Sequence, residues 1–190
     1  MNADELLNYL AGLIAGDGDL YYRKGKGEYR IRISDSSREF LESVSELIRK
    51  TLHINTRIYR HGRYNCFILT LYSKNLFFEV QKRISANIEN PSIAFARGLL
   101  DAEGGVSKSA KGPIRIHFTN KDLRLINSYV RVLDRLGIRY YITKSGPKYK
   151  VFVQNKENTR KLILMLNPLH PKIRLKYQKL MGTWHPSGPR

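Results

Sequence analysis

Two acidic residues stand at matching places in two similar stretches of the chain. Residues 10–18 read LAGLIAGDG and residues 96–104 read ARGLLDAEG, so Asp17 and Glu103 each follow an apolar run and precede a glycine. Carboxylate oxygens without histidine or cysteine beside them suit a hard divalent cation such as Mg²⁺. Two carboxylates held close together repel each other, and a cation between or beside them relieves that repulsion. We therefore expect Asp17 and Glu103 to form one metal-dependent site.

Small residues in the same stretches indicate how the two acids are brought together. Gly12 and Gly16 are four residues apart, as are Gly98 and Ala102, so each pair lies on one face of a helix. Missing side chains let two helix backbones approach closely. Each small face could instead pack on its own sheet. Because the pattern occurs twice, we expect the two helices to pack on each other across a pseudo-twofold axis.

Both stretches belong to a longer internal repeat. IRISDSSREFLE (31–42) aligns with IHFTNKDLRLIN (116–127), and LHINTRIY (52–59) aligns with LGIRYYIT (136–143). We therefore predict an α+β fold of two tandem α-β-β-α-β-β-α units, residues 1–90 and 91–190, each with a four-stranded antiparallel sheet. Apolar spacing and turn residues predict helices at 4–16, 40–52, 74–86, 91–102, 126–136, 156–166 and 172–181, and hairpin turns at 24–27, 61–63, 110–113 and 145–147.

The predicted strands alternate between apolar and basic residues. Ile31 and Ile33 share one face of their strand, whereas Arg30 and Arg32 share the other, and a strand over 138–143 follows the same rule. A basic outer face is often only a solvated surface, but its occurrence on four strands favours contact with nucleic acid. The predicted contact residues are Arg23, Arg30, Arg32, Arg57, Tyr59, Arg115, His117, Arg139, Tyr141 and Gln154.

The overall charge supports an acidic partner. The 190 residues include 34 Lys and Arg against 16 Asp and Glu, which gives a formal net charge of +18. Such an excess predicts binding to nucleic acid, and a basic β-ribbon is narrow enough to enter the major groove of DNA. A membrane surface is the alternative, but the chain has no long apolar run, amphipathic basic helix or lipidation motif.

Two features indicate an intracellular protein that is not secreted. The first ten residues, MNADELLNYL, carry two acids and lack the basic segment that begins a signal peptide. Cys66 is the single cysteine, so no disulfide forms within the chain, which fits a reducing compartment.

With both motifs in view, the chain resembles the LAGLIDADG homing endonucleases of the single-chain, two-motif type, in particular the compact enzymes encoded in archaeal introns. The first motif departs from the family pattern at Ala15 and Gly16, and the second ends in Glu103 instead of aspartate. The resemblance implies a monomer that binds a long double-stranded DNA site along two saddle-shaped sheets. It also implies hydrolysis of both strands across the minor groove, leaving 3′ overhangs.

The resemblance also implies which residues hold the metal. Asp17 and Glu103 would bind Mg²⁺, for which Mn²⁺ can substitute, with the backbone carbonyls of Gly16 and Ala102 completing the ligation. Asp101 has only Ala15 as its first-copy counterpart, so we expect it to hydrogen-bond locally. The family often places a basic residue near each scissile phosphate. Lys121, Lys74 and Lys156 are the candidates, and a phosphate clamp or a helix-end charge is the alternative role for each.

Two other functions are compatible with the same scaffold. A basic saddle can bind intron RNA, as a splicing maturase does, and one protein can perform both activities. A catalytically inactive DNA-binding regulator is the other alternative. The intact acids, Asp17 and Glu103, argue against that regulator.

Overall fold

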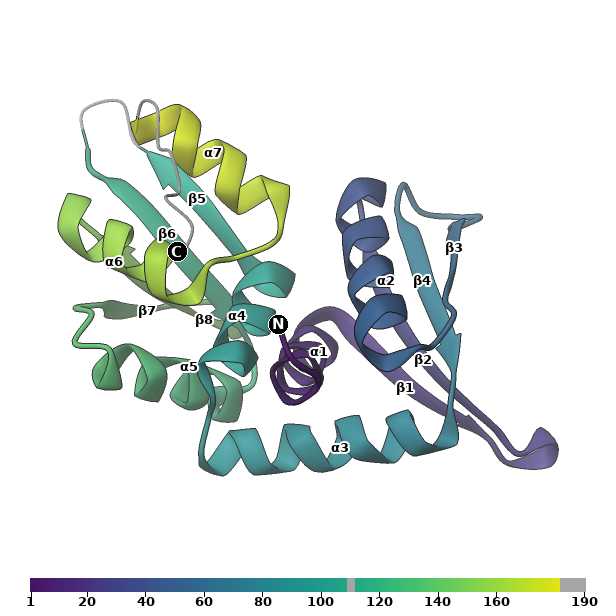
Figure 1. Ribbon diagram of the computed structural model, residues 1–190. Coiled ribbons are helices and arrows are strands. Elements are labelled where there is room, and N and C mark those ends of the chain that lie inside the picture. The colour runs from purple at the N-terminus through teal and green to yellow at the C-terminus, as the bar shows by residue number, and fades with distance from the viewer. Residues whose placement is uncertain (109–111, 182–190) are drawn as a thin grey trace.

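Each half of the chain forms one antiparallel sheet that is covered by helices on one of its faces (Figure 1). The computed structural model describes residues 1–108 and 112–181. The two sheets have the same strand order, β1-β2-β4-β3 and β5-β6-β8-β7. The predicted α+β fold of two α-β-β-α-β-β-α units is therefore confirmed.

The first unit runs from the first motif to a long helix that reaches the second unit. Its elements are α1 (Ala3–Asp17), β1 (Gly18–Arg23), the 3-10 turn η1 (Lys24–Lys26), β2 (Glu28–Asp35), α2 (Arg38–Leu52), β3 (Arg57–Arg60), β4 (Phe67–Tyr72) and α3 (Lys74–Glu89). The β1–β2 hairpin turns at 24–27 as predicted, and Gly27 adopts the left-handed backbone (φ 60°) that glycine tolerates best.

The second unit repeats this order and adds one helix. Its elements are α4 (Ile93–Glu103), β5 (Gly104–Lys108), β6 (Ile114–Asn120), α5 (Leu123–Arg135), β7 (Tyr141–Ser145), β8 (Lys148–Gln154), α6 (Lys156–Leu166) and α7 (Pro171–Met181). The predicted turn at 110–113 lies partly outside the described residues. The extra helix expected at 172–181 is present as α7, which lies beside β5 in Figure 1.

Local sequence explains where the two motif helices begin and end. The Asn2 side chain accepts the Glu5 backbone N–H and the Glu5 side chain accepts the Asn2 N–H, which is a capping box. The Ser92 hydroxyl accepts the Phe95 N–H at the start of α4. At the other ends, Gly18 and Gly104 turn the chain straight from a helix into the first strand of each sheet.

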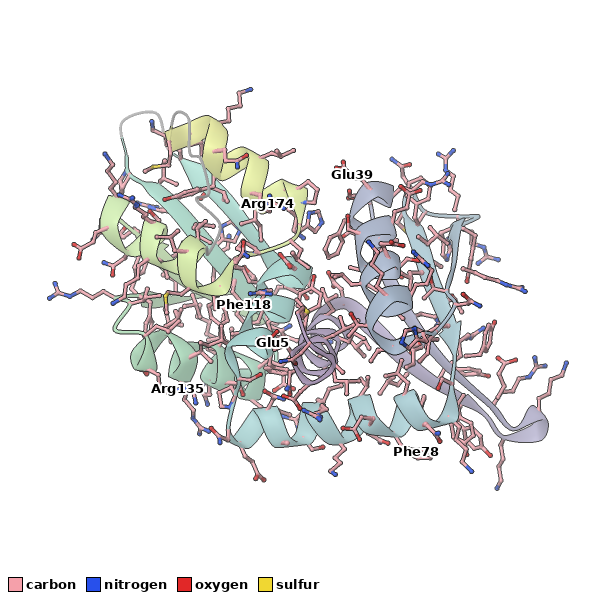
Figure 2. The ribbon with its side chains drawn as sticks, in the orientation of Figure 1. Glu5, Glu39, Phe78, Phe118, Arg135 and Arg174 are labelled. Carbon is pink, nitrogen blue, oxygen red and sulfur yellow. The ribbon has the colours of Figure 1, made fainter. Side chains whose placement is uncertain are left out.

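Two apolar cores lie between the sheets and their helices, and α1 and α4 join them. Ala11 of the first unit is buried in the second core, whereas Ala102 of the second unit is buried in the first core. Phe118 lies in the interior of the second unit (Figure 2). Because each core contains a residue from the other unit, the helix pair contributes to the stability of both halves.

The long helix α3 connects the two units along the bottom of Figure 1. Its last carbonyls are bound by the second unit, since the Ser128 hydroxyl donates to Ile88 O (3.1 Å) and Arg131 donates to Glu89 O (2.8 Å). Arg135 lies where α3 turns into α4 (Figure 2). These bonds fix the second unit relative to the helix that leads into it.

Two predicted strands begin later in the structure than their apolar alternation indicates, and the first, expected over 54–59, begins at Arg57. The strand expected over 138–143 begins instead at Tyr141, and Ile138 is buried in the preceding loop. Ile142 was expected on the helix-covered face, but its side chain is 45% exposed. The reason is that β7 lies at the edge of its sheet, so Ile142 has a neighbouring strand on one side only. Within residues 1–108 and 112–181, no helix combines the length and the apolar character needed to span a bilayer.

Candidate catalytic centre and nucleic-acid interface

The helices α1 and α4 touch backbone to backbone at their glycines. A Cβ atom added to Gly12 would lie 2.2 Å from the Phe95 carbonyl oxygen, and one added to Gly98 would lie 2.2 Å from the Tyr9 carbonyl oxygen. Real Cβ atoms do not approach that closely, so any side chain at either position would push the helices apart. The predicted packing of the two small faces on each other is confirmed.

The close contact continues to the ends of both helices. A Cβ atom on Gly16 would lie 2.5 Å from Ala102 Cβ and 3.6 Å from Glu103 Cγ. The next residue of α1 is Asp17, so the two acids emerge at the same end of the helix pair. The chain thereby brings together two residues that stand far apart in the sequence.

The two acids lie in a partly desolvated, electrostatically strained place. Desolvation raises the pKa of Glu103, the negative charge of Asp17 raises it further, and Lys148 and Lys172 act in the opposite direction. Desolvation also raises the pKa of Asp17, again against the charges of Lys172 and Lys148. Neither acid forms an ion pair with another described residue. Both carboxylates are therefore free to accept an external cation.

The donors at this place fit a hard divalent cation. They are carboxylate oxygens of Asp17 and Glu103 and the carbonyl oxygens near the helix ends, at Gly16 and Ala102. Among the described residues, three or more His, Cys, Asp or Glu side chains nowhere gather as a metal-binding group. A cation here would complete its coordination with backbone, water or phosphate oxygens, which is how Mg²⁺ is usually held.

Two lysines near the acids were not among the predicted site residues. Lys172, at the start of α7, donates from Nζ to the Ala102 carbonyl oxygen at 2.7 Å. Lys148, at the start of β8, is close enough for its charge to lower the pKa of both acids. Both come from the second unit. The sequence signals were weak, namely an extra helix after the second repeat and one basic residue beside a turn.

A polar network places the residues just before Lys172. Asp101 is fully buried and accepts three hydrogen bonds, from Tyr9 OH (2.9 Å), Leu169 N (2.9 Å) and His170 N (3.1 Å). The expectation that Asp101 bonds locally is wrong, because its partners lie on α1 and on the segment between α6 and α7. Burial raises the pKa of Asp101, and the three donors act in the opposite direction.

His170 continues this network into the first unit. Its Nδ1 accepts the Lys172 backbone N–H at 3.0 Å, so the ring proton is on Nε2, which donates to Asp35 Oδ2 at 3.0 Å. The ring stacks on Phe40 of α2 with centroids 4.3 Å apart. Burial tends to raise the pKa of Asp35, but hydrogen bonds from His170 and the Ser37 N–H hold it below its usual value. The segment of residues 167–172 thus contacts both units.

The structure places the three predicted lysines at different distances from the acids along the sheets. Lys121 follows β6, whose Phe118 pairs with Gly104 beside Glu103. Lys74 follows β4 at the hairpin end of the first sheet, where its Nζ lies 5.8 Å from the centre of the Tyr29 ring. Lys156 lines a surface hollow beside α6 with Arg160 and Leu164. Neither Lys74 nor Lys156 is brought to the acids.

The outer face of the first sheet carries the arginines and the tyrosine assigned to it. Strand pairing sets Arg23, Arg30, Arg32, Arg57 and Tyr59 on one side, while Ile31 and Ile33 are 1% and 2% exposed on the other. Arg30 lies over the Tyr21 ring at 4.7 Å. Arg32 is ion-paired with Asp19 on the neighbouring strand.

The outer face of the second sheet is built from different side chains. Arg115, His117, Tyr141 and Gln154 share this face, whereas Arg139 lies in the loop before β7. The His117 ring covers Gly105, where an added Cβ atom would lie 2.8 Å from its Nε2. Burial, followed by the charges of Lys150, Lys176 and Lys172, lowers the pKa of His117 to about 4.

Three nitrogens on these outer faces are buried without a hydrogen-bond partner among the described residues. They are Arg30 Nε, Arg115 Nε and His117 Nδ1. Buried polar atoms are normally hydrogen-bonded, so each exception calls for a partner such as water or an ion. Arg30 lies on the first sheet, and Arg115 and His117 lie on the second, so each sheet has unmet hydrogen-bonding capacity.

A pair of close-packed helices that ends in two acids, joined to two sheets with basic outer faces, defines a class of protein. Residues 4–84 and 90–165 match the family described as LAGLIDADG-like domain. The chain belongs to this family, and the resemblance seen in its two motifs is confirmed.

Individual relatives are named homing endonucleases. The chain is 30% identical over 164 residues to homing endonuclease I-DmoI from Desulfurococcus mucosus, which covers 81% of this chain and 82% of the relative. It is 24% identical to homing endonuclease I-ApeI from Aeropyrum pernix, over 93% of this chain and 87% of that one. Homing endonucleases are nucleases, which hydrolyse phosphodiester bonds, and this homology supports a DNA homing endonuclease.

Solved structures show the same fold. I-DmoI in complex with DNA and Mn superposes with a TM-score of 0.69 at 26% identity, covering 87% of this chain and 97% of that chain. Other I-DmoI complexes contain Ca or Mg. The N-terminal LAGLIDADG domain of DUF199/WhiA superposes with a TM-score of 0.62 at 15% identity, which shows the fold alone.

Proposed function

We propose that this protein is a site-specific homing endonuclease that hydrolyses both strands of a double-stranded DNA target. The observation that carries this proposal is the acid pair, Asp17 and Glu103, at one end of two helices in backbone contact. The reaction depends on Mg²⁺, with Mn²⁺ able to substitute, and it cuts across the minor groove to leave 3′ overhangs. Complexes of I-DmoI with DNA and divalent metals support the metal dependence.

The chain's own residues perform three tasks in this reaction. Asp17 and Glu103, with the carbonyls of Gly16 and Ala102, would hold a divalent cation at the end of the helix pair. A bound divalent ion supplies an activated water and neutralises charge on the phosphate. Because the glycine contact keeps α1 and α4 in a fixed relation, the two acids are in position before the DNA arrives.

The outer sheet faces bind the target. Their arginines, tyrosines, histidine and glutamine contact phosphates and base edges along the DNA. The two units, residues 1–90 and 91–190, act as a built-in pair, so one chain binds one site as a monomer. The net charge of +18 makes binding steeply dependent on salt, because each neutralised phosphate releases counterions.

The alternatives rest on no separate observation. An inactive regulator has no use for two free, desolvated carboxylates. Binding of intron RNA by the same basic faces is compatible with nuclease activity and does not replace it.

The test uses a supercoiled plasmid that carries the uninterrupted insertion site, incubated with Mg²⁺. Linear product with 3′ overhangs, mapped by sequencing the ends, is the expected result. A plasmid library of randomised sites provides the same readout where the insertion site is unknown. Intact plasmid under conditions where the protein binds the DNA would contradict the proposal, and protection of intron RNA in the same preparation would favour the maturase.

A further inference from the structure

The Lys172 ammonium group lies beside the two acids at the end of the helix pair. Its Nζ donates to Ala102 O at 2.7 Å, and its positive charge acts on both Asp17 and Glu103. It forms no ion pair with either carboxylate among the described residues. The lysine therefore binds the backbone oxygen and leaves the side-chain oxygens free.

This lysine is held in place from both units. Its backbone N–H is bound to His170 Nδ1, and His170 is bound in turn to Asp35 of the first unit. Leu169 N and His170 N are bound to Asp101 of the second unit. Ile173, next in sequence, is fully buried in the second core. These contacts fix the backbone of Lys172, from which its exposed side chain reaches the Ala102 carbonyl oxygen.

Among the described residues, no lysine of the first unit matches Lys172. The equivalent of Ala102 is Gly16, and no lysine donates to the Gly16 carbonyl within residues 1–108 and 112–181. The first-unit equivalent of Lys148 is Cys66. Strand pairing shows this, because Tyr149 pairs with Asn120 in the second sheet as Phe67 pairs with Asp35 in the first. The second-unit side of the centre therefore carries positive charge that the first-unit side lacks.

We propose that Lys172 is a resident cation of the catalytic centre. Its ammonium group holds the Ala102 carbonyl oxygen in the metal-free protein and releases it when a divalent cation binds. It then remains beside the phosphate of one strand only, so the two strands are cut at unequal rates. This inference rests on the proposed nuclease function. It adds to that function a competition between Lys172 and the metal, and a difference between the cleavage rates of the two strands. His170 acts as a positioning residue, because it reaches the centre only through Lys172.

The competition is tested without DNA, by titrating Mn²⁺ into the protein and following free Mn²⁺ by electron paramagnetic resonance. Lys172→Met removes a competing charge and frees the Ala102 carbonyl, so we expect Mn²⁺ to bind roughly 3- to 10-fold more tightly. Lys179→Met, on the same helix, is the matched control and should leave the affinity unchanged. Glu103→Gln should weaken the binding, which shows that the titration reports this site.

An unchanged or weaker Mn²⁺ affinity in Lys172→Met would overturn the competition. Lys172→Gln is the second variant, since it keeps a hydrogen-bond donor and loses only the charge. It should also bind Mn²⁺ more tightly than the wild-type protein. Circular dichroism of each variant checks that the fold is intact, which we expect because the Lys172 side chain is exposed.

The asymmetry is tested with a target duplex whose two strands carry different fluorescent labels. In Mg²⁺, Lys172→Met should slow cleavage of the strand nearer Glu103 by about 10- to 100-fold and the other strand by less than about 3-fold. Lys179→Met should slow neither strand. Equal slowing of both strands, or no slowing, would contradict the assignment. If the wild-type protein cuts no target at all, the proposed function fails, and the Mn²⁺ titration still decides the role of Lys172.

Discussion

The two units share one topology but differ in the side chains at their equivalent positions. At the start of the first sheet Asp19 on β1 is ion-paired with Arg32 on β2, whereas the equivalent pair of the second sheet is Gly105 and His117. Near the catalytic acids, the second unit supplies Lys148 and Lys172, and the first unit has Cys66 where Lys148 stands. The duplication preserved the frame and the acids, and it changed the charges around them.

The same contrast applies to hydrogen bonds that cross between the units. Asp35 and Asn120 are equivalent, and each accepts a backbone N–H two residues further on, from Ser37 (2.6 Å) and Asp122 (2.8 Å). Only Asp35 also binds His170. The same turn occurs in both units, but only in the first unit does its side chain also bind the segment between α6 and α7.

The largest loss of cleavage is expected from changes at Asp17 and Glu103, the acids that the two units share. Asp17→Asn and Glu103→Gln each remove one anionic ligand, and each should slow double-strand cleavage at least about 100-fold while DNA binding in Ca²⁺ is kept. Asp134→Asn, an exposed acid on α5, is the control. Rates are measured on supercoiled target plasmid, and affinities by gel shift. Wild-type cutting by both variants would overturn the catalytic assignment.

The helix contact should respond equally to changes made in either unit. Gly12→Val and Gly98→Val each force a side chain onto the backbone of the partner helix, so we expect each to lower the free energy of unfolding by more than about 3 kcal/mol. Gly25→Ala should change it by less than about 0.5 kcal/mol, since no atom lies within 4 Å of the new Cβ. Urea unfolding provides the comparison. Clearly unequal losses at Gly12 and Gly98 would argue against a symmetrical contact.

The buried bond between Tyr9 and Asp101 distinguishes the units, because the equivalent residues are Phe95 and Ala15. Tyr9→Phe makes the first unit resemble the second and leaves a buried carboxylate one donor short, which should cost about 1–3 kcal/mol of stability. Tyr64→Phe, at a side chain that is 69% exposed, is the control. Thermal unfolding measures both, and an unchanged midpoint in Tyr9→Phe would show that the bond adds nothing.

The two sheets should contribute unequally to DNA affinity. Arg115→Ala should cost about 1–3 kcal/mol of binding if Arg115 contacts a base, and Arg32→Ala should cost less because Asp19 already neutralises that guanidinium. Asp19→Asn should remove the ion-pair partner of Arg32 and so strengthen DNA binding. Gel shifts at several salt concentrations measure the effects, and a greater loss at Arg32 than at Arg115 would reverse the comparison.

The smallest effect concerns His117, which is equivalent to Arg32 but can lose its proton. Its pKa of about 4 in the folded protein lies below the value of about 6.5 in an unfolded chain. Between these values the unfolded state binds a proton that the folded state does not, so stability should fall as the pH falls from about 6.5 to about 4. His117→Asn should show a shallower decline in urea unfolding at pH 7 and pH 5. An identical decline would remove His117 as the cause.

The features that sequence reasoning predicted are those that depend on local pattern or on the repeat. The helix ends, the acids Asp17 and Glu103, and the outward arginines follow from spacing within a few residues, and duplication made each pattern visible twice. The helix contact was predictable because glycine and alanine occur at matching places in both motifs.

The features that it missed connect residues far apart in sequence and occur only once. Asp35 and His170 come from different units, and nothing near either residue indicates the other. Lys172 stands after the repeat has ended, so no second copy pointed to it. The exposure of Ile142 depends on β7 lying at a sheet edge, which is a property of strand order and not of the strand's own residues.

The bond from Tyr9 to Asp101 also bears on how such a chain evolves. Its symmetry mate is an apolar pair, since Phe95 is buried in the second core and Ala15 packs against that core. Two copies of the second unit would bury Asp101 against a phenylalanine ring, and two copies of the first would leave the Tyr9 hydroxyl facing alanine. Unpaired buried polar groups are costly. A homodimer of either half would therefore lack a buried hydrogen bond that the two different halves form together.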